Sequence, residues 1–228
     1  MIVLDKPLFK GLELNKIRPL TLVLAAAAGL ILPYLVQVIF DVLIPFPESW
    51  IRDFTDAFVF MDIAPAWSII LAVGIMGPIA EEICFRGGIF NAMRRDSNSI
   101  AAVIVSSLLF GAMHMIPFQI CYATLVGVIL GVICVVTKSA WPAILVHIVN
   151  NMCGIVIPES LNDSIIGFMT SGPAAPWIAT VLLAAALAAC IFGMARLQRK
   201  SGFRIAAYVS RNAKNALFSG EKGCAEKL

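Results

Sequence analysis

Two adjacent glutamates and an arginine interrupt a long apolar stretch of the sequence, WSIILAVGIMGPIAEEICFRGGIF. Glu82 and Arg86 are four residues apart, so on a helix they lie on one face and can form an ion pair. Glu81 lies about 100° around the helix from Glu82 and is not stacked on Arg86. The spacing therefore predicts an orienting pair, Glu82 and Arg86, beside a carboxylate that is free to act as a general base.

The two histidines of the chain lie in other apolar stretches, each with a partner at helical spacing. His114 follows Phe110 by four residues in FGAMH, and Asn151 follows His147 by four in HIVNN. A carboxylate, two imidazoles and an amide that converge in a dry cavity predict a hydrolase site. We expect Glu81 and one histidine to activate water, and the other histidine and the amide to donate hydrogen bonds to an oxyanion. Two histidines and a carboxylate are also the ligand count of an open catalytic zinc site.

The composition indicates that these residues are positioned by membrane helices. Hydrophobic residues make up 60% of the chain and charged residues only 14%, whereas about a quarter of the residues of a soluble domain are charged. We expect an all-α, polytopic helix bundle of about six spans, each near the ~20 residues that a bilayer requires. The apolar runs are 20–44, 66–93, 99–115, 118–137, 140–157 and 176–195, of which the third and fifth are short.

The charges between the runs predict the orientation of the bundle. Basic residues gather before the first run, at Arg94 and Arg95, and after the last run, whereas the segments 48–62 and 159–163 are acidic. The positive-inside rule then places both termini in the cytoplasm. The formal net charge is +3, and its excess beside the last span favours contact with anionic lipid headgroups of the bilayer, with no nucleic-acid partner.

Taken together, the three motifs resemble those of a known family. EEICFR at 81–86, FGAMH at 110–114 and HIVNN at 147–151 are similar to the Glu-Glu-x-x-x-Arg, Phe-x-x-x-His and His-x-x-x-Asn motifs of the CAAX protease and bacteriocin-processing family. This family, also called CPBP or Abi, includes the CAAX prenyl endopeptidases. The resemblance covers about 66–155.

The resemblance implies an intramembrane endopeptidase that hydrolyses a peptide bond of a membrane-associated peptide or protein. It implies that Glu81 and His114 activate water, that His147 and Asn151 form an oxyanion site, and that Glu82 and Arg86 orient them. A glutamate mechanism needs no cofactor and is preferred. The alternatives are a zinc-dependent protease, with the metal held by Glu81, His114 and His147, and a non-catalytic membrane immunity or binding protein. A proton-coupled transporter is disfavoured because the chain shows no inverted repeats.

The expected organisation is a cytoplasmic N-terminus over 1–19, a transmembrane protease domain over 20–197 and a basic cytoplasmic tail over 198–228. The compact chain looks prokaryotic, so we expect a multi-pass protein of the plasma (inner) membrane, and we disfavour a prenylated CAAX substrate. Gly127 and Gly131 form a small-xxx-small face that predicts helix packing, with a dimer contact as the alternative. Gly77 and Pro78 predict a kink just before the glutamates.

Overall fold

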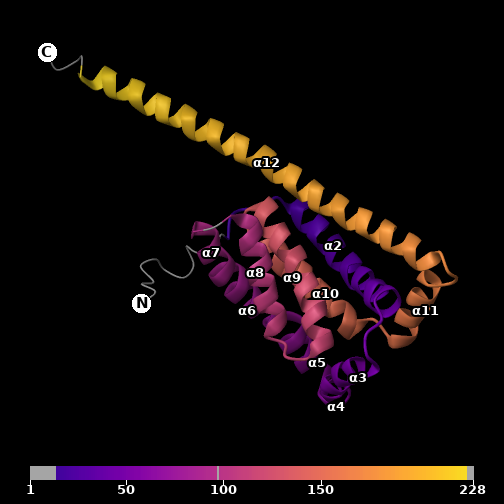
Figure 1. Ribbon diagram of the computed structural model, residues 1–228. Helices are drawn as coiled ribbons and strands as arrows, with labels where there is room; N and C mark the ends of the chain where they lie inside the picture. The colour runs from indigo at the N-terminus through magenta and orange to yellow at the C-terminus, as the bar shows by residue number, and fades with distance from the viewer. Residues whose placement is uncertain (1–13, 97, 225–228) are drawn as a thin grey trace.

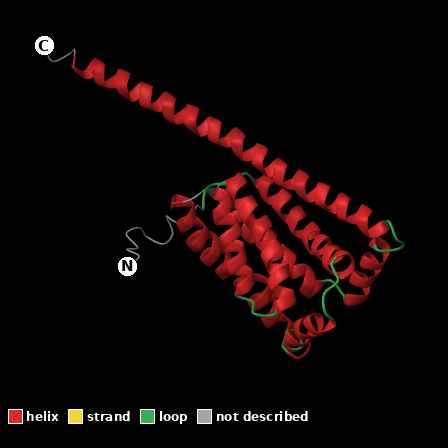
Figure 2. Cartoon of the chain, viewed as in Figure 1, coloured by secondary structure: helices red, strands yellow, loops and turns green. Residues whose placement is uncertain are grey.

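The computed structural model of the chain describes residues 14–96 and 98–224. Every regular element in these ranges is a helix, and Figure 2 shows helices joined by short loops. The predicted all-α bundle is therefore confirmed for the part of the chain that is described. In chain order the elements are α2 (Pro19–Val38), η1 (Ile39–Leu43), α3 (Glu48–Ala57), α4 (Phe60–Ile63), α5 (Ala66–Ile69), η2 (Ile70–Met76), α6 (Gly77–Glu82), η3 (Ile83–Phe90), α7 (Asn91–Asp96), α8 (Ser99–Ala112), α9 (Pro117–Thr137), α10 (Trp141–Val156), α11 (Glu159–Met169) and α12 (Ala175–Cys224).

Within the described ranges, four helical stretches are long and apolar enough to cross a membrane, by length and composition. A fifth is obtained if α10 and α11, which are bent by 108°, count as one span. α8 has 14 residues and is about 21 Å long, shorter than the ~30 Å hydrocarbon core. The predicted count of six spans therefore stays a prediction. The four stretches are Pro19–Val38, Ala66–Arg94, Pro117–Thr137 and Ala175–Arg199.

The two ends of the bundle differ in charge. Figure 1 shows α3, α4 and α11, which carry the acidic segments, at one end and α7 at the other. Asn15 bonds to the carbonyl oxygen of Lys138, and the Ser139 hydroxyl donates to the Asn15 carbonyl at 3.1 Å. The basic segment before α2 therefore lies beside the turn that contains Lys138. This separation supports the charge pattern on which the orientation prediction rests.

The two predicted terminal segments are described only in part. Residues 1–13 of the predicted N-terminal segment and 225–228 of the predicted tail lie outside the described ranges. The rest of the tail continues α12 as a single helix to Cys224, and Figure 1 shows this helix extending beyond the bundle. The boundary between domain and tail stays a prediction.

Close helix packing depends on small residues on α2 and α9. A Cβ atom added at Gly29 would lie 2.7 Å from Val149 Cβ, so α2 and α10 approach closely there. A Cβ added at Gly127 would lie 3.1 Å from Ser107 Cβ, and one at Gly131 would lie 3.1 Å from Val103. The predicted helix-packing face of α9 is therefore occupied by α8 of the same chain. The dimer contact at the same glycines stays a prediction, and α8 covers both of them in the single chain.

The span that carries the glutamates, Ala66–Arg94, contains two π-helical segments, η2 and η3. Gly77 donates its N–H to the Ala72 carbonyl five residues earlier. Pro78 follows and has no N–H to continue the regular ladder, so a widened turn precedes α6. Such turns are frequent at functional sites, and this one occurs where the sequence predicts a kink.

Gly111 fixes the approach of α8 to α9 beside Phe110. A Cβ at this position would lie 2.0 Å from Thr124 Oγ1 and 2.6 Å from the Ile120 carbonyl oxygen. We expect Gly111→Ala to lower the free energy of unfolding by about 1–3 kcal/mol, because a backbone atom must move. Thermal unfolding of the detergent-solubilised protein measures this. Gly154→Ala is the control, since nothing lies within 4 Å of its new methyl group; equal midpoints for both variants would contradict the prediction.

Candidate active site

Glu82 and Arg86 form the ion pair that the sequence predicts. Arg86 Nε lies 3.3 Å from Glu82 Oε2, and the two side chains are 1% and 0% exposed. Arg86 Nη2 also donates to the Gly127 carbonyl at 2.9 Å, and its guanidinium carbon lies 4.9 Å from the centre of the Phe110 ring. The arginine therefore ties the glutamate span to α8 and α9. It also neutralises a carboxylate that would be costly to bury alone.

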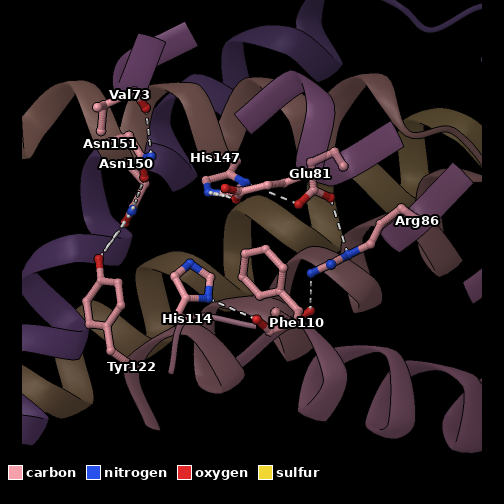
Figure 3. Close-up of polar contacts among 11 residues, drawn as sticks. Val73, Glu81, Arg86, Phe110, His114, Tyr122, His147, Asn150 and Asn151 are labelled. Carbon is pink, nitrogen blue, oxygen red and sulfur yellow. Dashed lines mark hydrogen bonds and ion pairs between the residues drawn. The ribbon is translucent and has the colours of Figure 1, made fainter. Parts of the chain in front are cut away.

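His147 on α10 contacts both glutamates through its two ring nitrogens, and Figure 3 shows it beside Glu81. Its Nδ1 is 3.1 Å from Glu82 Oε1, and its Nε2 is 3.6 Å from Glu81 Oε2. The histidine side chain is 5% exposed and that of Glu81 is 27% exposed. The sequence predicted the pairing of Glu82 with Arg86 but missed that Glu82 also holds His147; the roles of the two glutamates stay predictions. Glu81 is the most exposed member of the cluster.

His114 is linked to the cluster of Glu81, Glu82 and His147 by the Phe110 ring, which contacts both histidines. Its Nδ1 is 2.9 Å from the Phe110 carbonyl oxygen, one helical turn back. A carbonyl oxygen only accepts, so Nδ1 carries the proton and Nε2 of the neutral ring is left as an acceptor. The Phe110 ring packs edge-on against His114 at 5.1 Å and against His147 at 5.7 Å. In Figure 3 the second ring nitrogen of His114 faces the side on which His147 lies.

Asn151 lies at the other side of His147 in a chain of polar groups (Figure 3). Its Nδ2 donates to the Val73 carbonyl at 3.1 Å, and its oxygen accepts from Asn150 Nδ2 at 3.3 Å. The Asn150 amide contacts the Tyr122 hydroxyl at 3.2 Å through Nδ2 and at 3.4 Å through Oδ1. Neither Asn150 nor Tyr122 was predicted as a site residue. For Tyr122, the sequence did offer one indication, a tyrosine hydroxyl within an apolar run.

The predicted metal ligands Glu81, His114 and His147 do not fit a metal ion in this arrangement. Both histidines use Nδ1, one on Glu82 and the other on the Phe110 carbonyl, which leaves only Nε2 of each ring as a possible donor. A zinc ion needs three such donors directed to one point at about 2.0–2.2 Å. Within residues 14–96 and 98–224, no group of three histidine, cysteine, aspartate or glutamate residues is arranged to hold a metal. We therefore derive no step through a metal.

Comparison with known proteins gives two matches over this part of the chain. Residues 63–153 match the family model described as "Rce1-like: Type II CAAX prenyl endopeptidase Rce1-like". A protein of Bacillus subtilis (strain 168), named "Putative membrane peptidase YdiL", is 34% identical over 83 residues. The match covers 36% of this chain and 34% of that protein, so it spans about a third of the relative's length. The comparison with solved structures gave no significant match.

The matched segment contains all six residues predicted for the site. The apolar helix bundle, the three motifs and both matches are those of membrane peptidases by similarity. Residues 63–153 are similar to the CAAX prenyl endopeptidases, the family that the three motifs resemble. The chain is accordingly an integral membrane protein; the particular membrane stays a prediction.

Proposed function

We propose that the protein is an intramembrane endopeptidase that hydrolyses a peptide bond with water activated by Glu81 and His114. One observation carries the proposal. A partly accessible carboxylate, Glu81, lies 3.6 Å from the buried His147, whose other nitrogen is bonded to Glu82. A buried imidazole whose Nδ1 is oriented by a carboxylate is a recurrent catalytic arrangement.

The hydrogen bond between His147 and Glu82 supports a hydrogen-bond donor role for His147 in the reaction. Glu82 and Arg86 neutralise one another, which leaves the carboxylate of Glu81 without a counter-charge. His147 is the cationic partner that lies within reach of this carboxylate when its ring gains a second proton. Because Nδ1 donates to Glu82, the protonated ring has Nε2–H left to donate. This donor would stabilise negative charge that develops on a substrate carbonyl oxygen.

The tautomer of His114 supports the opposite role for that residue. Its Nδ1 proton is held by the Phe110 carbonyl, so Nε2 has a lone pair available to accept a proton from water. Glu81 offers a second acceptor on the same water. Asn151 uses one N–H on Val73 and retains a second N–H for the oxyanion.

The proposed reaction has two proton transfers. The water oxygen attacks the carbonyl carbon of the scissile bond while Glu81, assisted by His114, takes a proton from that water. The carbonyl oxygen becomes an oxyanion that accepts hydrogen bonds from His147 and Asn151. The tetrahedral intermediate then collapses, the C–N bond breaks, and the proton held by Glu81 passes to the leaving nitrogen. The products are a new carboxyl group and a new amine.

The surface beside Glu81 supports an apolar substrate segment. Only 28% of the apolar part of the span Ala66–Arg94 is buried inside the protein. Ala80 and Cys84, on the same helix as Glu81, are exposed. An apolar peptide lying in the bilayer can therefore reach the carboxylate from this side. We propose a membrane-associated peptide or protein as the substrate.

The test uses the full chain reconstituted in liposomes with a mixture of quenched-fluorescent apolar peptides of about 20 residues. Wild type is expected to cleave some of them, and mass spectrometry in H₂¹⁸O is expected to find one ¹⁸O in the new carboxyl group. A wild type that binds these peptides without cleaving them would overturn the proposal. It would favour the non-catalytic membrane protein instead.

His114→Phe tests whether His114 assists Glu81 in the activation of water, in the same assay. It keeps an aromatic ring against Phe110 and removes both nitrogens. We expect kcat to fall by about 10²–10⁴-fold, the usual contribution of a general base. The unfolding midpoint is expected to change little, since the one polar contact of His114 is with its own helix. Met113→Leu in the same turn is the control; cleavage by His114→Phe at the control rate would contradict this role.

A further inference from the structure

Hydrogen bonds link the side chains of Tyr122, Asn150 and Asn151 to the carbonyl oxygen of Val73. The role inferred for these bonds rests on the function proposed above. We infer that Tyr122 is a positioning residue for Asn151, and that it acts through Asn150. Tyr122 lies on α9, the two asparagines on α10, and Val73 on the span of the glutamates (Figure 3). The chain therefore links the three elements on which the site is built.

The directions of the hydrogen bonds fix the orientation of Asn151. The Val73 carbonyl only accepts, so the group of Asn151 that faces it at 3.1 Å is Nδ2. The oxygen of Asn151 then faces Asn150, which donates to it at 3.3 Å. Asn151 is thus held by one bond at each end of its amide. Only its second N–H remains for a substrate oxygen.

Asn150 needs Tyr122 in order to hold this geometry. Asn150 is buried and only 5% exposed. The Tyr122 hydroxyl is the hydrogen-bond partner of its amide on the side away from Asn151. In an apolar interior an amide that loses a partner turns to find another, because an unpaired polar group is costly there. Without the hydroxyl, Asn150 would turn away from Asn151. The Asn151 amide would then keep only its bond to Val73.

The position of Val73 explains why the orientation of the Asn151 amide affects the reaction. Val73 lies in η2, eight residues before Glu81 on the same span. The bond from Asn151 to Val73 therefore sets the distance between the oxyanion donors on α10 and the carboxylate that activates water. A small misplacement of such a donor reduces the rate rather than substrate binding. A fall in kcat at an unchanged KM therefore distinguishes a misplaced Asn151 amide from a general loss of substrate affinity.

Tyr122→Phe removes the hydroxyl and keeps the ring. With the best-cleaved fluorogenic peptide of the liposome assay, we expect kcat to fall about tenfold and KM to stay unchanged. In an Asn151→Ala background the same substitution is expected to cause no further loss, because the residue it positions is absent. Tyr34→Phe is the matched control: it removes a hydroxyl from a half-buried tyrosine on α2. We expect it to have wild-type kinetics.

Asn150→Leu provides a second variant that breaks the same chain at another point. It is expected to lower kcat to a similar extent, and Tyr122→Phe is expected to add nothing to it. A wild-type kcat in Tyr122→Phe would overturn the inference, as would an equal loss in the presence and absence of the Asn151 amide. A raised KM with unchanged kcat would also overturn it. A wild type that cleaves no peptide would instead overturn the proposed function, and the role of Tyr122 with it.

Discussion

Arg86→Met is expected to lower the free energy of unfolding by about 3–5 kcal/mol and to abolish cleavage. The substitution keeps an apolar side chain of similar length in the space beside Phe110. It leaves the carboxylate of Glu82, which is fully buried, without its guanidinium partner. It also removes the hydrogen bond to the Gly127 carbonyl, by which the glutamate span is held to α9. Denaturant or thermal unfolding of the detergent-solubilised protein measures the change.

Two further variants separate this explanation from a loss of packing. Glu82→Gln combined with Arg86→Met is expected to recover most of the lost stability, because an amide is far less costly to bury than a carboxylate. Arg196→Met on α12 is the matched control: this arginine is exposed and lies over Phe192, so the midpoint should not change. A single variant as stable as wild type would show that Arg86 does not neutralise a buried charge.

The sequence predicts the spans well because a bilayer imposes a length that can be counted. Each of the four long apolar stretches coincides with a predicted apolar run: Pro19–Val38, Ala66–Arg94, Pro117–Thr137 and Ala175–Arg199. Composition does not determine where a helix turns or ends inside such a run. Helix α8 therefore ends at Ala112 within a run predicted to continue to 115. Hydropathy likewise does not reveal the π-helical turns, which depend on local hydrogen bonds.

Contacts within one helix were predictable, and contacts between helices were not. The spacing of Glu82 and Arg86 or of Phe110 and His114 specifies a shared face, and both pairs are in contact. Nothing in the spacing specifies that Glu82 also reaches His147, 65 residues away. The bonds from Tyr122 to Asn150 were missed for the same reason. Pairing between helices depends on their tilt and rotation, which periodicity does not encode.

Glu81→Gln is expected to lower kcat by about 10²–10⁴-fold, because the amide cannot take a proton from water. Gln is close to Glu in size, so it fills the same space beside His147. The unfolding midpoint is expected to stay close to that of wild type, since Glu81 is partly exposed and its nearest polar partner is 3.6 Å away. The liposome cleavage assay and thermal unfolding measure the two quantities on one preparation.

The neighbouring variant Glu82→Gln is expected to show the opposite balance, and the contrast tests the division of work between the two glutamates. Removing the Glu82 charge leaves Arg86 buried and unpaired and frees His147 from its fixed orientation. The free energy of unfolding should fall by about 3–5 kcal/mol, and activity should be lost with it. If Glu81→Gln destabilised the protein as much as Glu82→Gln, Glu81 would be part of the scaffold. If it still cleaved peptides at the wild-type rate, another group would be the base.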